Sequence, residues 1–457
     1  MMELKGRKVL VVGLGKTGQA LVNFLQEQGA EVWVSEKKPA SELKIDLKKI
    51  EEKGVRIETG GHRLETFLAA DLIIPSPGVP PLPEIRTARE RGKEILAEIE
   101  LARAFIKGKI IGITGTNGKS TTTTLTHKIL RAAHRRSHLA GNIGTPLIRF
   151  APSNLEADIY VTEISSFQLE YCQNFRCEAA VFLNFSTNHL DWHGSLEAYW
   201  AAKEKLFLNL TEKDLAILNR DDPKIWALRK KIRAPVYFFS RKTRVNPGIY
   251  VEGNWIYLNC GQRRPLFPLK SIRLPGQHNL ENVLASSLAG HLFGVPGSII
   301  RKVVSQFTGL EHRLEKVASW RGLTFYNDSK ATTVEATIRA LLSLKPGIVL
   351  IMGGRDKGAD FGLLRPYVKN KVSHLILLGE AREKIRQALE GTVPIEEAST
   401  MREAVYLAVK LARRGESILL SPACTSFDMF QDFEHRGRVF KKEVRRLISS
   451  EAGGSRK

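Results

Sequence analysis

The sequence predicts an α/β protein of three domains, because short apolar runs alternate with amphipathic helical segments in three successive stretches. Its length of 457 residues is several times the roughly 100–200 residues of a common domain. Hydrophobic residues make up 43% of the chain and charged residues 26%, which excludes a wholly disordered protein. We place the domains at residues 1–97, 98–309 and 310–457.

The expected strands are short runs rich in β-branched residues. In the first stretch they are Lys8–Val12, Glu31–Ser35 and Asp71–Ile74, with a helix over Thr17–Gln28. In the second they are Lys109–Thr114, Asp158–Glu163, Ala179–Asn184, Leu215–Asn219 and Pro235–Ser240, and in the third Ile348–Met352, His374–Leu378 and Ser417–Ser421. Apolar and polar residues alternate over Gly248–Asn259 around a Glu-Gly-Asn turn, which predicts an antiparallel hairpin.

Positive charge is the unusual feature of the composition. The chain has 70 lysine and arginine residues against 48 acidic residues, a formal net charge of +22. Such a balance suits nucleic acid, an anionic membrane surface or small anionic substrates. The basic residues are scattered, and the cluster at Arg436–Arg446 alternates at helical spacing with Val439, Phe440 and Val444. We interpret that cluster as a solvated helix face rather than a polyanion patch.

Signals for secretion, membrane insertion and cross-linking are missing from the sequence. No apolar stretch approaches the roughly 18–20 residues of a membrane helix, and Val9–Val12 is too short for a signal-peptide core. The four cysteines form no C-x-x-C pair, so neither a disulfide framework nor a zinc site is indicated. We therefore expect a cytoplasmic protein without a membrane span.

The first expected strand runs into a glycine loop, Gly13–Gly18, with the pattern G-x-G-x-x-G. Glycines at such a strand-to-helix turn leave the helix N-terminus open to a diphosphate. Glu36 ends the next expected strand, where a dinucleotide-binding fold places a ribose-binding carboxylate. Taken alone, this pattern favours a nicotinamide oxidoreductase, and the alternative is a glycine turn that packs without a ligand.

A second glycine loop, Gly112–Ser120, ends in Gly-Lys-Ser and lies between an apolar strand and a threonine-rich helix start. Backbone N–H groups of such a loop hold phosphates, the lysine neutralises developing charge, and the serine hydroxyl binds Mg²⁺. Strict Walker A spacing requires glycine at position 113, which is Ile113 here, so this loop departs from the standard length. We interpret it as an ATP loop rather than a chance glycine turn.

A carboxylate and a histidine follow two further expected strands. Glu163 ends the run Ile159–Glu163, and His189 lies just beyond Ala179–Asn184. In α/β sheets, ligands bind beyond the carboxyl ends of strands. A lone histidine is usually structural or exposed, but beside an ATP loop and an acid the arrangement favours a metal site.

Motifs in a fixed order run through almost the whole chain. They read GTNGKST at 115–121, GNIG at 141–144, EISSFQLE at 163–170, NHLDWH at 188–193 and YWAAKEKLF at 199–207. Later ones read GQHNLEN at 276–282, EHR at 311–313, YNDSKAT at 326–332, GGRDKGADF at 353–361 and LLSPACTSFDMFQDFEHRG at 419–437. Together they resemble the motifs of the Mur ligases. The last block resembles specifically the D-glutamate-adding members.

The resemblance implies a Rossmann-like N-terminal domain for a UDP-sugar, a central P-loop-type ATPase domain and a Rossmann-like C-terminal domain for an amino acid. It implies an ATP-dependent ligase that adds D-glutamate to UDP-N-acetylmuramoyl-L-alanine through an acyl phosphate, in cytoplasmic peptidoglycan precursor synthesis. Its partners would be these small molecules and not nucleic acid, and a monomer is expected. The charge of +22 then suits three anionic substrates.

The resemblance also implies roles for individual residues. Lys119, Glu163, His189 and Lys203 would be catalytic. ATP would be held by Gly115, Thr116, Asn117, Gly118, Lys119, Ser120 and Thr121, with Asn279, Asn282, Arg313 and Asp328 around its adenine and ribose. Ser120 and Glu163 would hold one Mg²⁺ ion, and Glu163 and His189 would contribute to a second. In this family the lysine at the position of Lys203 is carbamylated, which turns a cation into an oxygen ligand.

Substrate contacts follow in the same way. Thr17, Glu36, Ser76, Gly78 and Asn142 are implied for the UDP-sugar, and Lys330, Thr332, Lys357, Ser426 and Phe427 for D-glutamate. Three hypotheses compete: an amino-acid ligase, a nicotinamide oxidoreductase and a basic nucleic-acid-binding ATPase. The oxidoreductase leaves the second glycine loop unexplained, and the third hypothesis lacks a nucleic-acid motif.

Overall fold

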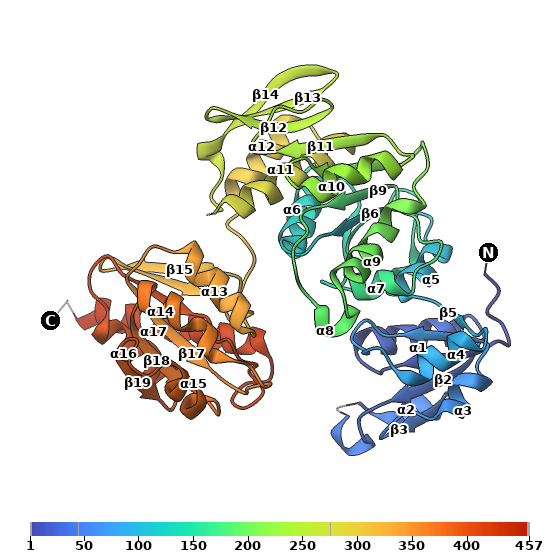
Figure 1. Cartoon of the computed structure of the whole chain (residues 1–457), viewed down its shortest axis with the longest axis horizontal. Helices are drawn as coiled ribbons and strands as arrows, with labels where there is room; N and C mark the ends of the chain where they lie inside the picture. The colour runs from blue at the N-terminus through green and yellow to red at the C-terminus, as the bar shows by residue number, and fades with distance from the viewer. Residues whose placement is uncertain (1, 44, 275, 455–457) are drawn as a thin grey trace. The chain divides into compact units, whose positions relative to one another are not determined.

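The structure, a computed structural model, describes residues 2–43, 45–274 and 276–454. The chain divides into two compact units, one of Met1–Arg273 with Gln277–Phe307 and one of Leu274–Gly276 with Thr308–Lys457. Three sheets flanked by helices make up the described chain, two in the first unit and one in the second (Figure 1). Within these described residues, no helix is long and apolar enough to cross a membrane.

The first sheet is parallel and has the order β3-β2-β1-β4-β5. Its strands are β1 (Lys8–Val12), β2 (Glu31–Glu36), β3 (Arg56–Thr59), β4 (Leu72–Pro75) and β5 (Glu94–Ile95), joined by α1 (Lys16–Glu27), η1 (Ala40–Glu42), α2 (Leu47–Glu51), α3 (Leu64–Ala69) and α4 (Pro83–Glu90). Apolar side chains bury β1 and β4 on both faces, as a parallel sheet covered by helices requires. The predicted strands are confirmed.

The second sheet has the order β14-β13-β12-β11-β10-β9-β6-β8-β7. Its strands are β6 (Lys109–Thr114), β7 (Ser137–Gly141), β8 (Ile159–Glu163), β9 (Ala179–Phe182), β10 (Leu215–Asn219), β11 (Val236–Ser240), β12 (Gly248–Glu252), β13 (Trp255–Cys260) and β14 (Gln262–Pro268). The predicted hairpin is β12–β13, and β14 extends it antiparallel at the sheet edge. Its helices are α5 (Glu98–Phe105), α6 (Lys119–Ala132), η2 (Leu147–Ser153), α7 (Ser166–Glu170), α8 (Leu190–His193), α9 (Leu196–Leu208), α10 (Pro223–Leu228), η3 (Arg229–Lys231), η4 (Leu269–Ser271), α11 (Gln277–Leu292) and α12 (Gly297–Gln306).

The third sheet has the order β15-β16-β20-β17-β18-β19. Its strands are β15 (Glu315–Trp320), β16 (Leu323–Asn327), β17 (Ile348–Gly353), β18 (Val372–Leu378), β19 (Ile395–Ala398) and β20 (Ser417–Leu420). Leu350 and Met352 pack into one apolar cluster, while Val349 and Ile351 of the same strand pack into another. Alternate residues therefore face opposite sides, and helices cover both. These helices are α13 (Val334–Ser343), η5 (Phe361–Leu364), α14 (Arg365–Lys371), α15 (Arg382–Leu389), α16 (Met401–Leu411) and α17 (Phe433–Gly454).

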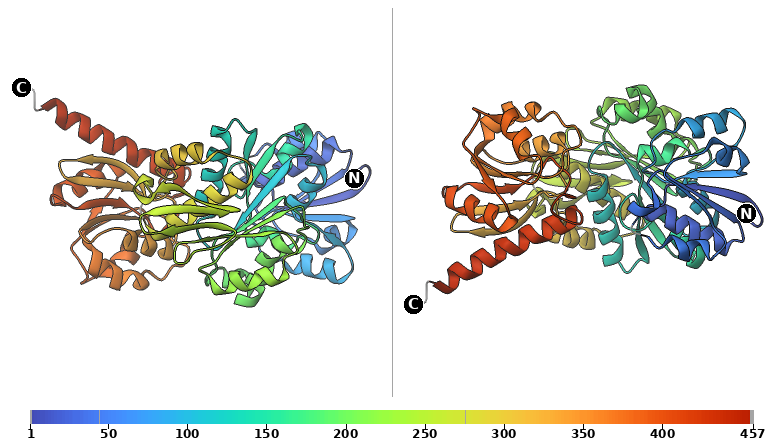
Figure 2. Two further views of the ribbon diagram at one scale, coloured as in Figure 1. Left: turned by 90° about the horizontal axis from the view of Figure 1, so that it is seen from above. Right: turned by 90° about the horizontal axis from the view of Figure 1, so that it is seen from below.

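The basic C-terminal tail forms α17, a long helix that Figures 1 and 2 show in red. Phe440 and Val444 are fully buried, and Val439, Leu447 and Ile448 pack against the same cluster. The predicted apolar face of the tail is thus confirmed.

Candidate functional site

The motifs of the first sheet lie beyond three neighbouring strands. The glycine loop follows β1, Glu36 ends β2, and Ser76 follows β4, with β1 between the other two. Thr17 lies in the first turn of α1, and Gly78 lies in the loop after β4. The carboxyl edge of this sheet therefore collects four of the residues predicted for the UDP-sugar, and the fifth, Asn142, follows β7 of the second sheet.

The first glycine loop is held by a carboxylate. Glu36 accepts hydrogen bonds from the backbone N–H of Leu14 at 2.7 Å and of Lys38 at 3.0 Å. The Ser76 hydroxyl donates to the Gly13 carbonyl at 2.9 Å. A Cβ on Gly18 would lie only 2.0 Å from the same carbonyl oxygen, so the helix approaches the strand this closely only with glycine there. Glu36 therefore sets the position of the loop itself.

The motifs of the second sheet also share one edge. Strands β9, β6, β8 and β7 are consecutive neighbours, and the loops that carry His189, Lys119, Glu163 and Asn142 follow them. Since these strands are mutually parallel, their carboxyl ends meet at the same edge of the sheet. The fold thus brings together residues that lie far apart in the sequence.

The second glycine loop is anchored by a neighbouring strand end. The N–H of Thr116 donates to the Asn184 carbonyl at 2.9 Å, and the N–H of Asn117 donates to the Asn184 side chain at 2.8 Å. Gly118, at φ +83°, ends the loop, and a Cβ there would meet the Asn282 side chain at 2.2 Å. Asn282 also accepts from the Thr122 hydroxyl at 3.2 Å. Glycine and asparagine together fix the loop as it enters α6.

The charged and hydroxyl groups of this loop lie at its helix end. The Lys119 ammonium donates to the carbonyls of Gly115 and Thr116, each at 2.9 Å. Ser120 is buried at 3% exposure, and Ser120 and Thr121 follow Lys119 in the first turn of α6. A cation and N–H groups at a helix N-terminus form a phosphate-binding arrangement.

The two oxygens of the Glu163 carboxylate differ in their hydrogen bonding. Its Oε1 accepts a hydrogen bond from the Asn142 amide at 2.9 Å, whereas its Oε2, though buried, has no hydrogen-bond partner within the described chain. The residue is 3% exposed. A buried carboxylate oxygen without a donor is costly unless a cation occupies the site. This oxygen therefore fits a divalent metal ligand, and Asn142 holds the carboxylate in place.

Lys203 is buried on α9 at 1% exposure. Its Nζ donates to the Gly115 carbonyl at 3.0 Å and lies 4.8 Å from the centre of the Tyr199 ring. Burial lowers the pKa of Lys203 well below its usual value; the nearby Lys119 cation lowers it further, and Glu163 opposes both. The amine is thereby shifted toward its neutral form, which is nucleophilic.

His189 lies in a left-handed conformation, with φ of 53°, at the start of α8. Its ring lies 4.7 Å from the Phe167 ring and 6.0 Å from the Tyr199 ring, which orients it beside α9. The described residues contain no cluster of three or more His, Cys, Asp and Glu side chains that holds a metal. Glu163 alone does not complete a metal site, and Ser120, His189 and Lys203 are the other residues predicted for it.

In the second unit, three neighbouring strands carry the remaining predicted residues. Lys330 and Thr332 follow β16, Ser426 and Phe427 follow β20, and Lys357 follows β17, in a sheet where β20 lies between the other two. Lys330 lies over the Phe433 ring at 5.1 Å. Phe427 is 59% exposed, an unusual state for a large apolar side chain. The loops after β16, β17 and β20 therefore lie at one edge of this sheet, although their motifs are far apart in the sequence.

Arg436 is a residue of this region that sequence analysis missed. It is 1% exposed, and its guanidinium donates to the hydroxyl and carbonyl of Ser329 and to the carbonyls of Cys424 and Thr425 at 2.8–3.2 Å. It therefore ties the loop after β16 to the loop after β20. Arg436 and Gly437 end the last motif of the sequence. Because many basic residues follow in the tail, the sequence did not distinguish Arg436 from them.

The start of the second unit is also tightly bonded. Asp328 accepts hydrogen bonds from the Leu314 N–H at 2.9 Å and the Ser421 hydroxyl at 3.0 Å, and burial raises the pKa of Asp328 to about 7. His312 packs directly against Gly437 of α17. Arg313 and Asp328 belong to this unit and Asn279 and Asn282 to the first, so their shared contacts with a nucleotide stay predictions.

The fold and these sites define a class: α/β proteins with three successive sheets along the chain, the second of which carries a Gly-Lys-Ser loop at a helix start. Three family profiles match the chain: a Mur ligase MurD-like N-terminal domain at residues 7–97, a Mur ligase middle domain at 113–290 and a Mur ligase glutamate ligase domain at 312–424. The chain belongs to the Mur ligase family.

Relatives and solved structures agree with this assignment. The chain is 44% identical to the UDP-N-acetylmuramoylalanine–D-glutamate ligase of Koribacter versatilis, over 98% of this chain and 100% of that protein. It is 46% identical to the enzyme of the same name from Acidobacterium capsulatum, over 97% of each. The fold is similar to that of UDP-N-acetylmuramate-alanine ligase MurC from Thermotoga maritima, with a TM-score of 0.58 at 18% identity over 97% of this chain and 100% of the other.

Proposed function

We propose that this chain is an ATP-dependent ligase that joins D-glutamate to UDP-N-acetylmuramoyl-L-alanine, in peptidoglycan precursor synthesis. The observation that carries the proposal is 44–46% identity, over nearly the whole chain, to two ligases named for this reaction. Amide formation at neutral pH needs an activated acyl group. The alanine carboxylate attacks the γ-phosphate of ATP, which gives an acyl phosphate and releases ADP. The D-glutamate amine then attacks the acyl carbon, loses a proton, and phosphate leaves as the amide forms.

Phosphoryl transfer asks the protein mainly for positioning and for charge neutralisation. In this proposal the backbone of Gly115, Thr116, Asn117, Gly118 and Thr121 holds the ATP phosphates. Lys119 then exchanges its two loop carbonyls for phosphate oxygens. Asn279, Asn282, Arg313 and Asp328 are proposed to surround the adenosine.

We propose that two Mg²⁺ ions bind at this centre, which supply charge neutralisation for the transferring phosphoryl group. The unpartnered Oε2 of Glu163 and the buried Ser120 hydroxyl support one ion, and Glu163 with His189 a second. The lowered pKa of Lys203 supports its carbamylation. Its neutral amine adds to CO₂, the carbamic acid releases a proton to water, and the resulting carbamate offers oxygen ligands.

The two substrates are assigned to the outer sheets. Thr17, Glu36, Ser76 and Gly78, at the edge of the first sheet, would contact the UDP-sugar together with Asn142 of the second sheet. D-Glutamate carries two carboxylates, which need cations and donors. We propose Lys330, Thr332, Lys357, Ser426 and Phe427 for this pocket, with Arg436 holding two of the loops together. Because both nucleotide substrates are cytoplasmic metabolites, we propose that the enzyme acts there, as a monomer.

A phosphate-release assay tests the function. Purified protein is given UDP-N-acetylmuramoyl-L-alanine, ATP and Mg²⁺, with D-glutamate, L-glutamate, L-lysine or diaminopimelate in separate reactions. We expect turnover with D-glutamate, and little with L-glutamate, because inverting the α-carbon misplaces the amine relative to both carboxylates. Comparable turnover with diaminopimelate would contradict the proposed amino acid but not the ligase reaction. No phosphate release with any amino acid would contradict the reaction itself.

A further inference from the structure

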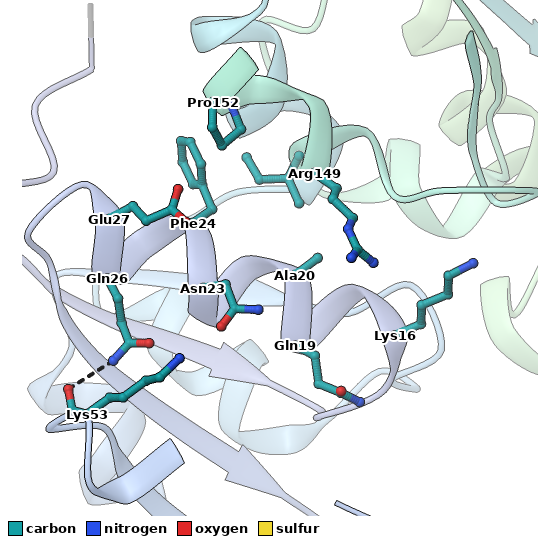
Figure 3. A pocket seen from close by; sticks show the side chains of 11 residues that line it. Lys16, Gln19, Ala20, Asn23, Phe24, Gln26, Glu27, Lys53, Arg149 and Pro152 are labelled. Carbon is teal, nitrogen blue, oxygen red and sulfur yellow. Dashed lines mark hydrogen bonds between the residues drawn. The ribbon is translucent and has the colours of Figure 1, made fainter. Parts of the chain in front are cut away.

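A cavity of about 1010 Å³ lies along α1, and Lys16 of the first glycine loop lines one end of it (Figure 3). One wall is a face of α1 from Lys16 to Glu27, and the other is η2, which follows the GNIG motif. Thr17, Glu36 and Ser76, proposed for the UDP-sugar, do not line it. The volume falls at the upper end of the roughly 300–1,000 Å³ of small-molecule pockets.

The charged groups of this cavity are mostly positive. Lys16, Lys53 and Arg149 contribute three cations from separate segments, against the single carboxylate of Glu27. Neither Lys53 nor Arg149 makes a side-chain hydrogen bond or ion pair with any residue in the described ranges. Figure 3 shows Lys16 and Arg149 at one end of the cavity and Glu27 at the other. The cationic end can therefore accept an anion without first breaking an ion pair.

The rest of the lining is amphipathic. Ala20 and Pro152 supply apolar surface, Gln19, Asn23 and Gln26 supply amide groups, and the buried side chains of Phe24 and Ile148 lie behind this surface. Such a mixture suits a molecule with an apolar or aromatic body and a negatively charged head. We propose that this cavity is a second ligand site, for a phosphorylated small molecule whose phosphate binds Lys16 and Arg149 and whose body lies on Ala20 and Pro152.

A ligand in this cavity would affect the reaction centre indirectly, through the hydrogen bond of Lys16. The Lys16 ammonium donates a hydrogen bond to the Gly144 carbonyl, in the loop whose Asn142 holds the Glu163 carboxylate. A phosphate in the cavity competes with that carbonyl for the ammonium. Occupation of the cavity therefore loosens the support of Glu163 and lowers turnover; this consequence, unlike the binding itself, rests on the proposed function.

Binding is tested with 1-naphthyl phosphate, a fluorescent aromatic monophosphate, by fluorescence anisotropy. The protein is first saturated with ADP, Mg²⁺ and UDP, so that both glycine loops are filled. We expect saturable binding to the wild-type protein, roughly 10-fold weaker binding for Arg149→Ala, the usual loss for a charge-assisted contact, and a smaller loss for Lys53→Ala, which makes no proposed contact with the phosphate. Ala20→Phe should abolish binding by filling the cavity without a change of charge.

The matched control is Arg86→Ala with Lys128→Ala, which removes two exposed cations of the same unit outside the cavity. It should bind the probe as the wild type does. Equal affinity of the wild type, the Arg149→Ala variant and the Ala20→Phe variant would overturn the site. Equal losses in the control and in the Lys53→Ala/Arg149→Ala double variant would also overturn it, since net charge alone would then explain binding.

The coupling has a separate readout. In the phosphate-release assay the probe should lower turnover of the wild type but not of the Ala20→Phe variant. Binding of the probe without any change in turnover would overturn the proposed coupling through Lys16, but it would not contradict the ligand site itself. A wild-type protein that binds the probe but releases no phosphate would instead contradict the proposed function.

Discussion

The two glycine loops of the first unit begin alike and differ in what surrounds them. Each follows a buried strand and enters a helix, at Lys16 in α1 and at Lys119 in α6. Around the first, the nearest acid is Glu36, and both of its carboxylate oxygens accept backbone N–H groups. Around the second, Glu163 keeps one buried oxygen unpartnered among the described residues, and Lys203 is a buried amine.

The comparison shows why a glycine pattern alone does not identify chemistry. A carboxylate whose oxygens both accept hydrogen bonds stabilises the loop beside it, whereas a buried carboxylate oxygen without a donor and a buried amine with a lowered pKa are the features on which the proposed metal site rests. Catalysis depends on groups positioned before the reaction, at a cost to the fold. The first loop is therefore expected to affect substrate affinity, and the second to affect turnover.

The largest effect is expected for Lys203→Ala, which removes the amine that we propose is carbamylated. Turnover should fall by at least ~10³-fold, because a metal ligand of the reaction centre is lost. Formate or acetate should restore part of it by occupying the vacated ligand position. The measurement is steady-state phosphate release with and without these carboxylates. Lys205→Ala, on the same helix, serves as the control and should retain most activity.

Two outcomes would contradict the assignment of Lys203. One is substantial activity of Lys203→Ala without added carboxylate. The other is an inactive variant that neither formate nor acetate rescues although its thermal unfolding matches the wild type. In that case the lysine would act as an amine, through its hydrogen bond to the Gly115 carbonyl.

A somewhat smaller loss is expected for Lys119→Ala, about 10²- to 10³-fold in turnover, the usual scale for one preorganised charge partner. Stability should change little, since the ammonium's hydrogen bonds to the Gly115 and Thr116 carbonyls stay within its own loop. Steady-state rates and a thermal unfolding curve test both statements. Lys128→Ala, an exposed position of α6, is the control. Near-normal turnover would remove the ATP-loop assignment.

The first loop should respond differently to Glu36→Ala. The Leu14 N–H of the loop and the Lys38 N–H after β2 lose their acceptor, so the KM for the UDP-sugar should rise roughly 10-fold, the cost of a hydrogen bond to a charged group. The kcat and the KM for ATP should stay close to wild type. Glu42→Ala, in the neighbouring η1, is the control for charge. A large fall in kcat with an unchanged KM would contradict the proposed difference between the two loops, because the first loop would then take part in the chemistry.

Much of this comparison was predictable from the sequence. The buried strands β1, β6 and β17 are uninterrupted apolar runs, so their periodicity identifies them directly. Edge strands such as β3 and β15 were missed, because their residues are half-exposed and carry charges. The domain boundaries near residues 97 and 310 stay predictions, as do the roles of individual site residues.

Long-range contacts were not predictable in the same way. The bond between Asn142 and Glu163 joins two strand ends that only the sheet order makes neighbours. Arg436 looked like one of many basic residues of an amphipathic tail, and its burial depends on how α17 packs on the third sheet. Local patterns report local structure, whereas burial of a charge is a property of the assembled fold.

The smallest expected effect concerns Glu98, which lies between the two glycine-loop sheets. It is the first residue of α5, is 2% exposed, and accepts the Ile148 N–H of η2 at 2.7 Å. Burial raises the pKa of Glu98 from 4.5 to about 7, and its backbone hydrogen bonds oppose the shift. The folded protein therefore holds a proton on this carboxyl at pH values where the unfolded chain has released it.

The sign of the stability effect follows from this difference in proton binding. Between pH 4.5 and 7 the folded state binds more protons than the unfolded state at this group, so its contribution to the free energy of unfolding falls as pH rises. From pH 6 to 8 the fall should be about 1 kcal/mol. Glu98→Gln removes the titrating group and keeps an oxygen acceptor for Ile148. The free energy of unfolding of this variant, measured by urea denaturation relative to the wild type, should therefore rise by that amount between pH 6 and pH 8, since all other titrating groups cancel in the difference. A difference that does not change with pH would show that Glu98 is charged in the folded protein, and that the junction between the two sheets tolerates a buried carboxylate as the reaction centre does.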